Sequence, residues 1–212
     1  MCHPHPTVTT IGFLRPFAFS LHGMGCAEEV FFINKQAKNL RLTLILAMLT
    51  AISIVCGKYL AIRGGDVMRF SLENMPIIFA GMVFGPAAGA LVGVVADLVG
   101  CIMVGYTINP VVTLGAGAIG LIAGGMPMLL KRARIEGTLE TVITVAAAHL
   151  VGSVLIKTLG LSAYYDMPFI ILMLWRVLNY AIVGALDGVL VHVIKRNKGI
   201  SLQINRLKGE EK

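Results

Sequence analysis

The sequence predicts an all-α integral membrane bundle of six transmembrane helices. Three observations predict it: the composition, a series of apolar segments of spanning length, and the positions of the basic residues. Of the 212 residues, 57% are hydrophobic and only 14% are charged, and the mean hydropathy is +0.83. Soluble domains contain about 25% charged residues. The composition therefore excludes an ordinary soluble domain.

Six apolar segments follow one another, separated by short polar or Gly/Pro-containing breaks. About 20 apolar residues span the hydrocarbon core of a bilayer, and only the second segment is clearly shorter. It is expected to start as an irregular or interfacial stretch. The segments run from about Asn39 to Ile62, Glu73 or Pro76 to Gly85, Pro86 to Val104, Pro110 to Leu130, Thr138 to Ser162, and Pro168 to Ile194.

The segments divide the chain into three parts. Residues 1–38 form an N-terminal extension that is expected to be poorly ordered, because Arg15 and Pro16 split its one apolar patch. Residues 39–195 form the membrane domain, and residues 196–212 form a basic cytoplasmic tail. A signal peptide would need a basic start and an unbroken apolar core, and neither is present in the extension.

The basic residues provide a test of six spans that does not depend on hydropathy. They form three groups: Lys35, Lys38 and Arg41; Lys131, Arg132 and Arg134; Lys195, Arg196 and Lys198. With six spans, all three groups lie on one side, which the positive-inside rule identifies as the cytoplasm. We therefore expect a protein of the cell membrane with both termini in the cytoplasm. Topology also accounts for the net charge of +7, so we expect no nucleic-acid partner.

Glycines in the third and fourth segments predict close helix packing. Gly85, Gly89 and Gly93 recur every four residues and are expected to share one helix face. Small residues in this pattern allow helix backbones to touch inside a bilayer. Asp97 follows four residues later and is expected near the same face. Further close-packing positions are expected at Gly115, Gly117, Gly120, Gly124 and Gly125.

Ionisable side chains interrupt the apolar segments. Charges in the hydrocarbon core usually face a bundle interior or a cavity. The cations Lys58, Arg69, Lys157 and Arg176 outnumber the acids Glu73 and Asp97 in the outer half, which favours an anionic ligand. Two polar stripes suggest a cavity that opens outward; one contains His149, Ser153 and Lys157, and the other contains Arg176, Tyr180 and Asp187.

Each of these side chains also has a structural interpretation. Lys58 and Lys157 can extend to the outer interface, and Arg176 can pair with Asp97. His149 fits better as a hydrogen-bonded packing residue than as a ligand, and Asp187 can form a structural hydrogen bond. Trp175 can stack on a flat ligand or face lipid.

Motifs of catalysis and metal binding are missing. The chain has no G-x-x-x-x-G-K-[ST], H-E-x-x-H or G-x-S-x-G sequence. Its cysteines, Cys2, Cys26, Cys56 and Cys101, lack metal-ligand spacing, and the two in apolar segments are expected as small apolar packing residues. We therefore expect no enzyme activity, no ATP hydrolysis, no metal and no cofactor. Two other classes stay open: a self-contained secondary transporter or channel that uses Asp97 and Arg176 as a relay, and a membrane enzyme.

The stretch MRFSLENMPIIFAGMVFGPAAGALVGVVADLVGC resembles the substrate-binding S component of energy-coupling factor (ECF) vitamin transporters, most closely the folate family. The likeness covers about Asn39 to Lys195. Its most specific part is the run F-S-x-x-x-x-P-I-I-x-A-G-x-x-F-G-P, which is followed by Gly89, Gly93, Asp97 and Gly100. The ordered combination of these positions carries the resemblance.

The resemblance implies a six-helix bundle that captures a vitamin from outside and topples in the membrane to release it inward. It implies three kinds of partner: the vitamin, a membrane coupling (T) subunit and two ABC-type ATPase subunits. In this family the first helix carries an A-x-x-x-A motif that contacts the T subunit, and Ala47 and Ala51 match that motif.

Folate, the ligand that the resemblance favours, has a flat pterin and a glutamate tail with carboxylates. Arg176 is the first choice for a carboxylate because its guanidinium presents a matching fork. Lys58 resembles a basic family position at the end of the first helix. Asn179 and Asn109 can form hydrogen bonds with the edge of the pterin. The full candidate set is Arg176, Lys58, Asn179, Lys157, Asn109, Arg69, Asp97 and Trp175.

One loop departs from the folate pattern. Many folate-type members carry an aromatic P-x-F-P-G-F-T-like loop after the third helix, whereas this chain has Gly105-Tyr-Thr-Ile-Asn-Pro110. Pantothenate, a thiamin precursor and a queuosine precursor therefore remain alternative ligands within the same family.

Overall fold

The computed structural model describes residues 40–64, 68–165, 169–197 and 199. The chain forms two compact units, Met1–Leu42 and Thr43–Lys212. Nearly all of the first unit, like the predicted extension at residues 1–38 and most of the tail, lies outside the described residues. The second unit contains the helical bundle.

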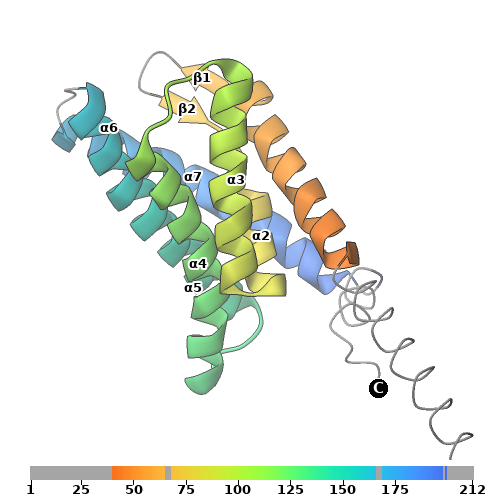
Figure 1. The fold of residues 1–212 in the computed structure, drawn as a ribbon. Helices are drawn as coiled ribbons and strands as arrows, with labels where there is room; N and C mark the ends of the chain where they lie inside the picture. The colour runs from red at the N-terminus through yellow and green to blue at the C-terminus, as the bar shows by residue number, and fades with distance from the viewer. Residues whose placement is uncertain (1–39, 65–67, 166–168, 198, 200–212) are drawn as a thin grey trace, which may run out of the picture. The chain divides into compact units, whose positions relative to one another are not determined.

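Helices form almost all of the described chain (Figure 1). The first, Leu40–Tyr59, ends in a π-helical turn, η1 (Val55–Tyr59). The helices that follow are α2 (Asn74–Phe84), α3 (Pro86–Val104), α4 (Pro110–Arg132), α5 (Thr138–Ala148), the π-helix η2 (His149–Ile156), α6 (Lys157–Tyr165) and α7 (Phe169–Arg196). α5, η2 and α6 join without a break into one long helix, of which Thr138–Ala163 forms the apolar span.

The predicted fold class is confirmed. In the described part of the chain, five helices are long and apolar enough to cross a membrane, and α2 is a shorter apolar helix of 11 residues. The predicted segments agree with the helices to within about four residues at each end. The link between the first two helices differs from the expectation, because strands β1 (Ile62–Gly64) and β2 (Met68–Phe70) pair there as a small antiparallel hairpin.

Gly85 separates α2 from α3. Its φ of 100° lies where a β-carbon is disfavoured, so the break requires a glycine. Pro86 then occupies the first turn of α3, where its missing N–H has no helical partner to lose. The prediction that Gly85 shares a packing face with Gly89 and Gly93 is therefore wrong, since Gly85 is the turn itself.

Five other glycines pack α3 and α4 together, and Gly115 of α4 packs against η2 instead; the five are Gly89, Gly93, Gly117, Gly120 and Gly124. A β-carbon built on Gly89 would lie 2.6 Å from the carbonyl oxygen of Gly120, and one on Gly93 would overlap the carbonyl of Ala116. A β-carbon on Gly124 would overlap Pro86. Gly125 has open space around its Cα, so its predicted packing role is wrong.

Helix α2 is the centre of the core. Most of its residues are buried, including Ile77, Ile78 and Ala80. It contacts α3, α4 and α7, and its apolar side chains pack with Val92 of α3 and Ile119 of α4. Because α2 is enclosed by other helices, it does not need spanning length, and its first residues lie inside the bundle.

Candidate functional site

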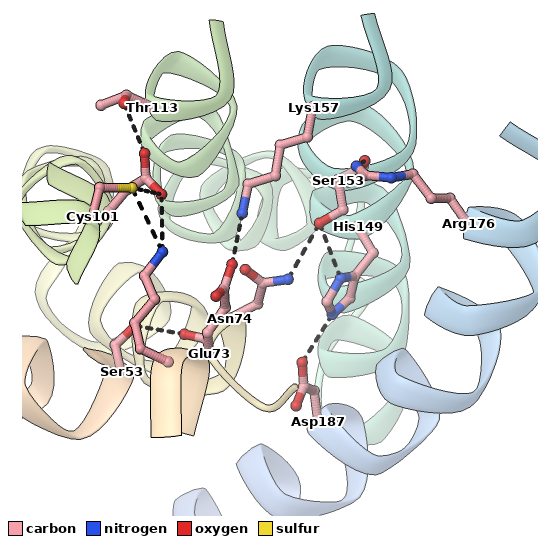
Figure 2. Close-up of polar contacts among 12 residues, drawn as sticks. Ser53, Glu73, Asn74, Cys101, Thr113, His149, Ser153, Lys157, Arg176 and Asp187 are labelled. Atoms are coloured by element: carbon pink, nitrogen blue, oxygen red, sulfur yellow. Dashed lines mark hydrogen bonds and ion pairs between the residues drawn. The ribbon is translucent and has the colours of Figure 1, made fainter. Parts of the chain in front are cut away.

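Polar side chains from several helices meet at the start of α2 (Figure 2). Glu73 is the residue before α2, and its backbone carbonyl accepts a 2.7 Å hydrogen bond from Ser53 Oγ of the first helix. Asn74 Nδ2 donates to Ser153 Oγ of η2 at 3.2 Å. We call the whole set the polar cluster: Ser53, Lys58, Glu73, Asn74, Asp97, Cys101, Thr113, His149, Ser153, Lys157, Arg176 and Asp187.

Lys58 forms a buried ion pair with Asp97 of α3. The Lys58 Nζ lies 3.9 Å from Asp97 Oδ1, and the two side chains are 6% and 9% exposed. Thr113 of α4 donates to Asp97 Oδ2 at 2.7 Å, and Cys101 Sγ lies 3.7 Å from the ammonium. The ring centroid of Tyr106 lies 5.9 Å from the same nitrogen. Lys58 therefore does not extend to the interface, and Asp97 pairs with Lys58 rather than with Arg176.

Lys157 is also buried. Its Nζ donates to Glu73 Oε1 at 3.0 Å, and its side chain is only 4% exposed. Removing a charge from water is costly unless a counter-charge is close, and Glu73 provides one. The alternative that Lys157 extends to the interface is therefore wrong.

Arg176 is half-buried on α7 and is held differently from the two lysines. Its Nη1 donates at 2.9 Å to the backbone carbonyl of Ser153. Within the described residues no carboxylate pairs with its guanidinium. An arginine has five N–H donors, and this hydrogen bond uses one of them. The guanidinium is therefore held in place by the protein and keeps further N–H donors that a ligand can use.

A chain of buried hydrogen bonds continues from Asn74 and Ser153 to α7. Ser153 Oγ lies 3.5 Å from His149 Nδ1, and His149 Nε2 lies 3.0 Å from Asp187 Oδ2. The structural interpretations of His149 and Asp187 are confirmed. Serine, histidine and aspartate stand here in the order of a hydrolase triad, but Ser153 is 0% exposed. The arrangement therefore joins helices rather than presenting a nucleophile.

The remaining predicted site residues lie in varied settings. Asn109 caps α4, since its Oδ1 accepts from Val111 N and Val112 N, and its Nδ2 donates to Gly160 O at 2.9 Å. The side-chain amide of Asn109 therefore forms hydrogen bonds that stabilise the fold. Asn179 is buried, whereas Trp175 is 41% exposed. Arg69 lies opposite Arg63 in the hairpin, and its side chain is outside the described part of the structure.

Among the described residues, two cavities border the polar cluster. One of about 10 Å³ lies among Lys58, Glu73 and Asp97 and is about the size of one water molecule. The other, of about 630 Å³, runs between α5, η2 and α7; its lining is mostly apolar and includes His149 and Tyr180. Of the predicted stripes, His149 and Tyr180 line this larger cavity, whereas Ser153 and Lys157 are buried against the start of α2.

Eight members of the polar cluster are not in the predicted candidate set. His149, Ser153 and Asp187 belong to the predicted polar stripes, and the other five are Ser53, Glu73, Asn74, Cys101 and Thr113. Asn74 directly follows Glu73 in an otherwise apolar run, and that interruption is a usable signal. Cys101 and Thr113 lie one helical turn after Asp97 and Asn109 and so share a face with them. Cys101 is more than the small apolar packing residue that the sequence suggests, because its sulfur lies beside Lys58 and Asp97.

Comparisons with known proteins identify relatives of this fold. Residues 41–195 match the family described as ECF transporter, substrate-specific component. No curated protein matches the sequence. The solved structure of FolT bound with folic acid is similar, with a TM-score of 0.56 and 18% identity over 71% of this chain and 88% of that one.

A second similar structure is the S-component for biotin from an ECF-type ABC transporter. Its TM-score is 0.60 and its identity 17%, over 78% of this chain and 96% of that one. At such identities the two structures show the fold, and the family match covers most of the chain. This multi-pass membrane protein therefore belongs to the family of substrate-specific components of ECF transporters.

Proposed function

We propose that this S component binds folate, or a closely related vitamin with a carboxylate, at the polar cluster. The observation that carries the proposal is Arg176, a half-buried guanidinium without a carboxylate partner among the described residues. A guanidinium fork binds a carboxylate through two parallel hydrogen bonds. Its position within an apolar bundle strengthens such a pair, because little water competes for it.

The charges around Arg176 also support an anionic ligand. In the part of the polar cluster near the hairpin, the described side chains supply three cations, Lys58, Lys157 and Arg176, and two carboxylates, Glu73 and Asp97. Lys58 pairs with Asp97, and Lys157 pairs with Glu73. A ligand carboxylate at Arg176 would balance the remaining positive charge. Further members of the proposed binding set are Asn179, Arg69, Trp175 and Asn109.

The ligands named for the two similar structures share the required chemistry. FolT is described with folic acid, and the other protein is an S-component for biotin. Folic acid and biotin both join a ring system to a carboxylate. We favour folate because the run from Phe70 to Pro86 resembles the folate family, and biotin is the second candidate because that structure has the higher TM-score.

We propose that transport requires a T subunit and two ABC ATPase subunits. Ala47 and Ala51, which match the A-x-x-x-A motif, are exposed on the first helix, as a contact surface requires. We also propose that both termini lie in the cytoplasm of a cell-membrane protein, with the β1–β2 hairpin outside. The basic groups at Lys131 and Lys195 would then lie on the inner side.

Mass spectrometry of small molecules released from the detergent-purified chain tests the ligand directly. Release of a folate is the expected result, and release of biotin or another vitamin instead would contradict the folate assignment. Titration calorimetry with folic acid then tests the site. Arg176→Ala is expected to weaken binding by about 2–5 kcal/mol, because a buried charge pair loses one partner.

Arg196→Ala is the matched control for this titration. Arg196 ends the same helix and is exposed, so its removal is expected to leave the affinity for folic acid unchanged. Equal affinities of wild type and Arg176→Ala would remove Arg176 from the site.

A further inference from the structure

Helix α7, which carries Arg176, is attached to η2 at two points on one face. Arg176 donates to the backbone carbonyl of Ser153, and the carboxylate oxygen Oδ2 of Asp187 lies 3.0 Å from His149 Nε2. The two α7 residues are about three helical turns apart, or about 16 Å along the axis, so they point the same way. Between them, Tyr180 packs its ring 5.2 Å from that of His149.

Apolar packing also holds α7 in the bundle, since Leu172, Val183 and Val191 are buried. Large apolar side chains such as Leu174, Leu178 and Ile182 are exposed on the outside of the helix. In a bilayer, apolar side chains are as well placed against lipid as against protein, so helix faces are selected mainly by polar contacts and small residues. The stripe of Arg176, Tyr180 and Asp187 therefore adds to this packing the polar contacts that select the face of α7 that meets η2.

Asp187 lies at the most buried point of this stripe. The residue is 0% exposed, and its partner His149 is 3% exposed. His149 contacts Ser153, whose side chain is fixed in turn by Asn74 of α2. Ser153, whose carbonyl accepts the hydrogen bond from Arg176, is therefore itself anchored to α2 through its hydroxyl.

We infer that Asp187 and His149 are positioning residues that place the Arg176 guanidinium and thereby set selectivity for carboxylate ligands. The inference rests on the proposed role of Arg176. Asp187 itself lies too far along α7 to meet the same carboxylate. It acts by holding the rotation and the axial position of the helix that presents Arg176.

Paired affinities test this inference. The probes are folic acid and its diamide, in which both glutamate carboxylates are replaced by carboxamides, and the measured quantity is the ratio of their dissociation constants. Asp187→Asn keeps the size of the side chain and removes the charge that holds His149. We expect it to reduce the preference for folic acid about tenfold, as for coupled residues in one network. Arg176→Ala is expected to abolish the preference.

Two further variants separate positioning from general weakening of the fold. The double variant Asp187→Asn/Arg176→Ala is expected to show the same ratio as Arg176→Ala alone, because Asp187 acts only through Arg176. Glu140→Gln is the control: Glu140 of α5 lies 3.6 Å from Lys195 of α7, beyond Asp187 on the side away from Arg176. It should leave the ratio unchanged. An unchanged ratio in Asp187→Asn, or an additive double variant, would overturn the inference.

A measurement without ligand keeps the inference testable if Arg176 proves not to bind a carboxylate. Spin labels at the exposed Leu150 of η2 and Leu178 of α7 report the distance between the two helices by pulsed electron resonance. Asp187→Asn is expected to shift or broaden this distance distribution, and Glu140→Gln is not. If Asp187→Asn does not fold, His149→Gln breaks the same contact from the other helix. A distribution that stays unchanged would show that the pair does not position α7.

Discussion

Helices α3 and α4 are held together by backbone contact, whereas α7 is held to η2 by polar side chains. At the first interface, the carbonyl oxygen of Gly120 lies only 2.6 Å from the position that a β-carbon of Gly89 would take. At the second, His149 meets Asp187 and Arg176 meets the carbonyl of Ser153. The comparison shows two ways to join helices where lipid removes most of the hydrophobic driving force. The first joins helices rigidly, and the second also positions charge.

The α3–α4 interface is expected to show the largest effect of a single change. In Gly120→Leu, the new β-carbon would overlap the backbone of Gly89, which cannot move aside as a flexible side chain can. We expect loss of the folded protein in detergent, measured by size-exclusion chromatography and thermal unfolding. Gly125→Leu, on the same helix but with open space around its Cα, is the control and should fold. A folded Gly120→Leu protein with normal unfolding would contradict the close contact.

The Lys58–Asp97 pair is expected to show the next largest effect. Asp97→Ala leaves the ammonium of Lys58 buried without a carboxylate, which typically costs about 3–5 kcal/mol. The double variant Lys58→Met/Asp97→Leu removes both charges and is expected to be more stable than Asp97→Ala. Chemical unfolding in detergent measures both. Equal stability of wild type and Asp97→Ala would mean that the pair contributes nothing to the fold.

Asn109→Ala is expected to have a smaller effect. It removes the cap of α4 and the hydrogen bond from Asn109 Nδ2 to the carbonyl of Gly160. Loss of an N-cap alone typically costs about 1 kcal/mol. Asn109→Asp restores the acceptor for the cap but not the donor to Gly160, so the difference between the two variants isolates the cap. If Asn109→Ala unfolds like wild type, the capping geometry is not stabilising.

The two helix interfaces differ in how far the sequence can predict them. The spacing of Gly89 and Gly93 acts within one helix, so a periodic pattern is enough to predict a packing face. The wrong part of that prediction is Gly85, where a turn uses the glycine for its backbone conformation. Local spacing cannot distinguish these two uses of glycine unless the helix end is known.

The charged members of the polar cluster are predictable as single residues but not as pairs. Lys157 and Glu73 are 84 residues apart in sequence, and their contact depends on how the start of α6 lies beside the start of α2. The choice of Lys58 rather than Arg176 as the partner of Asp97 depends on the same tertiary arrangement. The π-helical geometry of η2 is also not predictable, because no motif in HLVGSVLI marks it.

The exposed face of the first helix is expected to show the smallest effect on stability. Ala47 and Ala51 are exposed, so Ala47→Trp fills no internal space and should unfold like wild type and bind the vitamin normally. If this face meets the T subunit, the indole will block the close approach that alanine allows, and transport by the reconstituted complex will be lost. Ala47→Ser, a small substitution at the same place, should retain transport. Lost vitamin binding in Ala47→Trp would instead mean that Ala47 packs inside the bundle, and undiminished transport would remove it from the coupling surface.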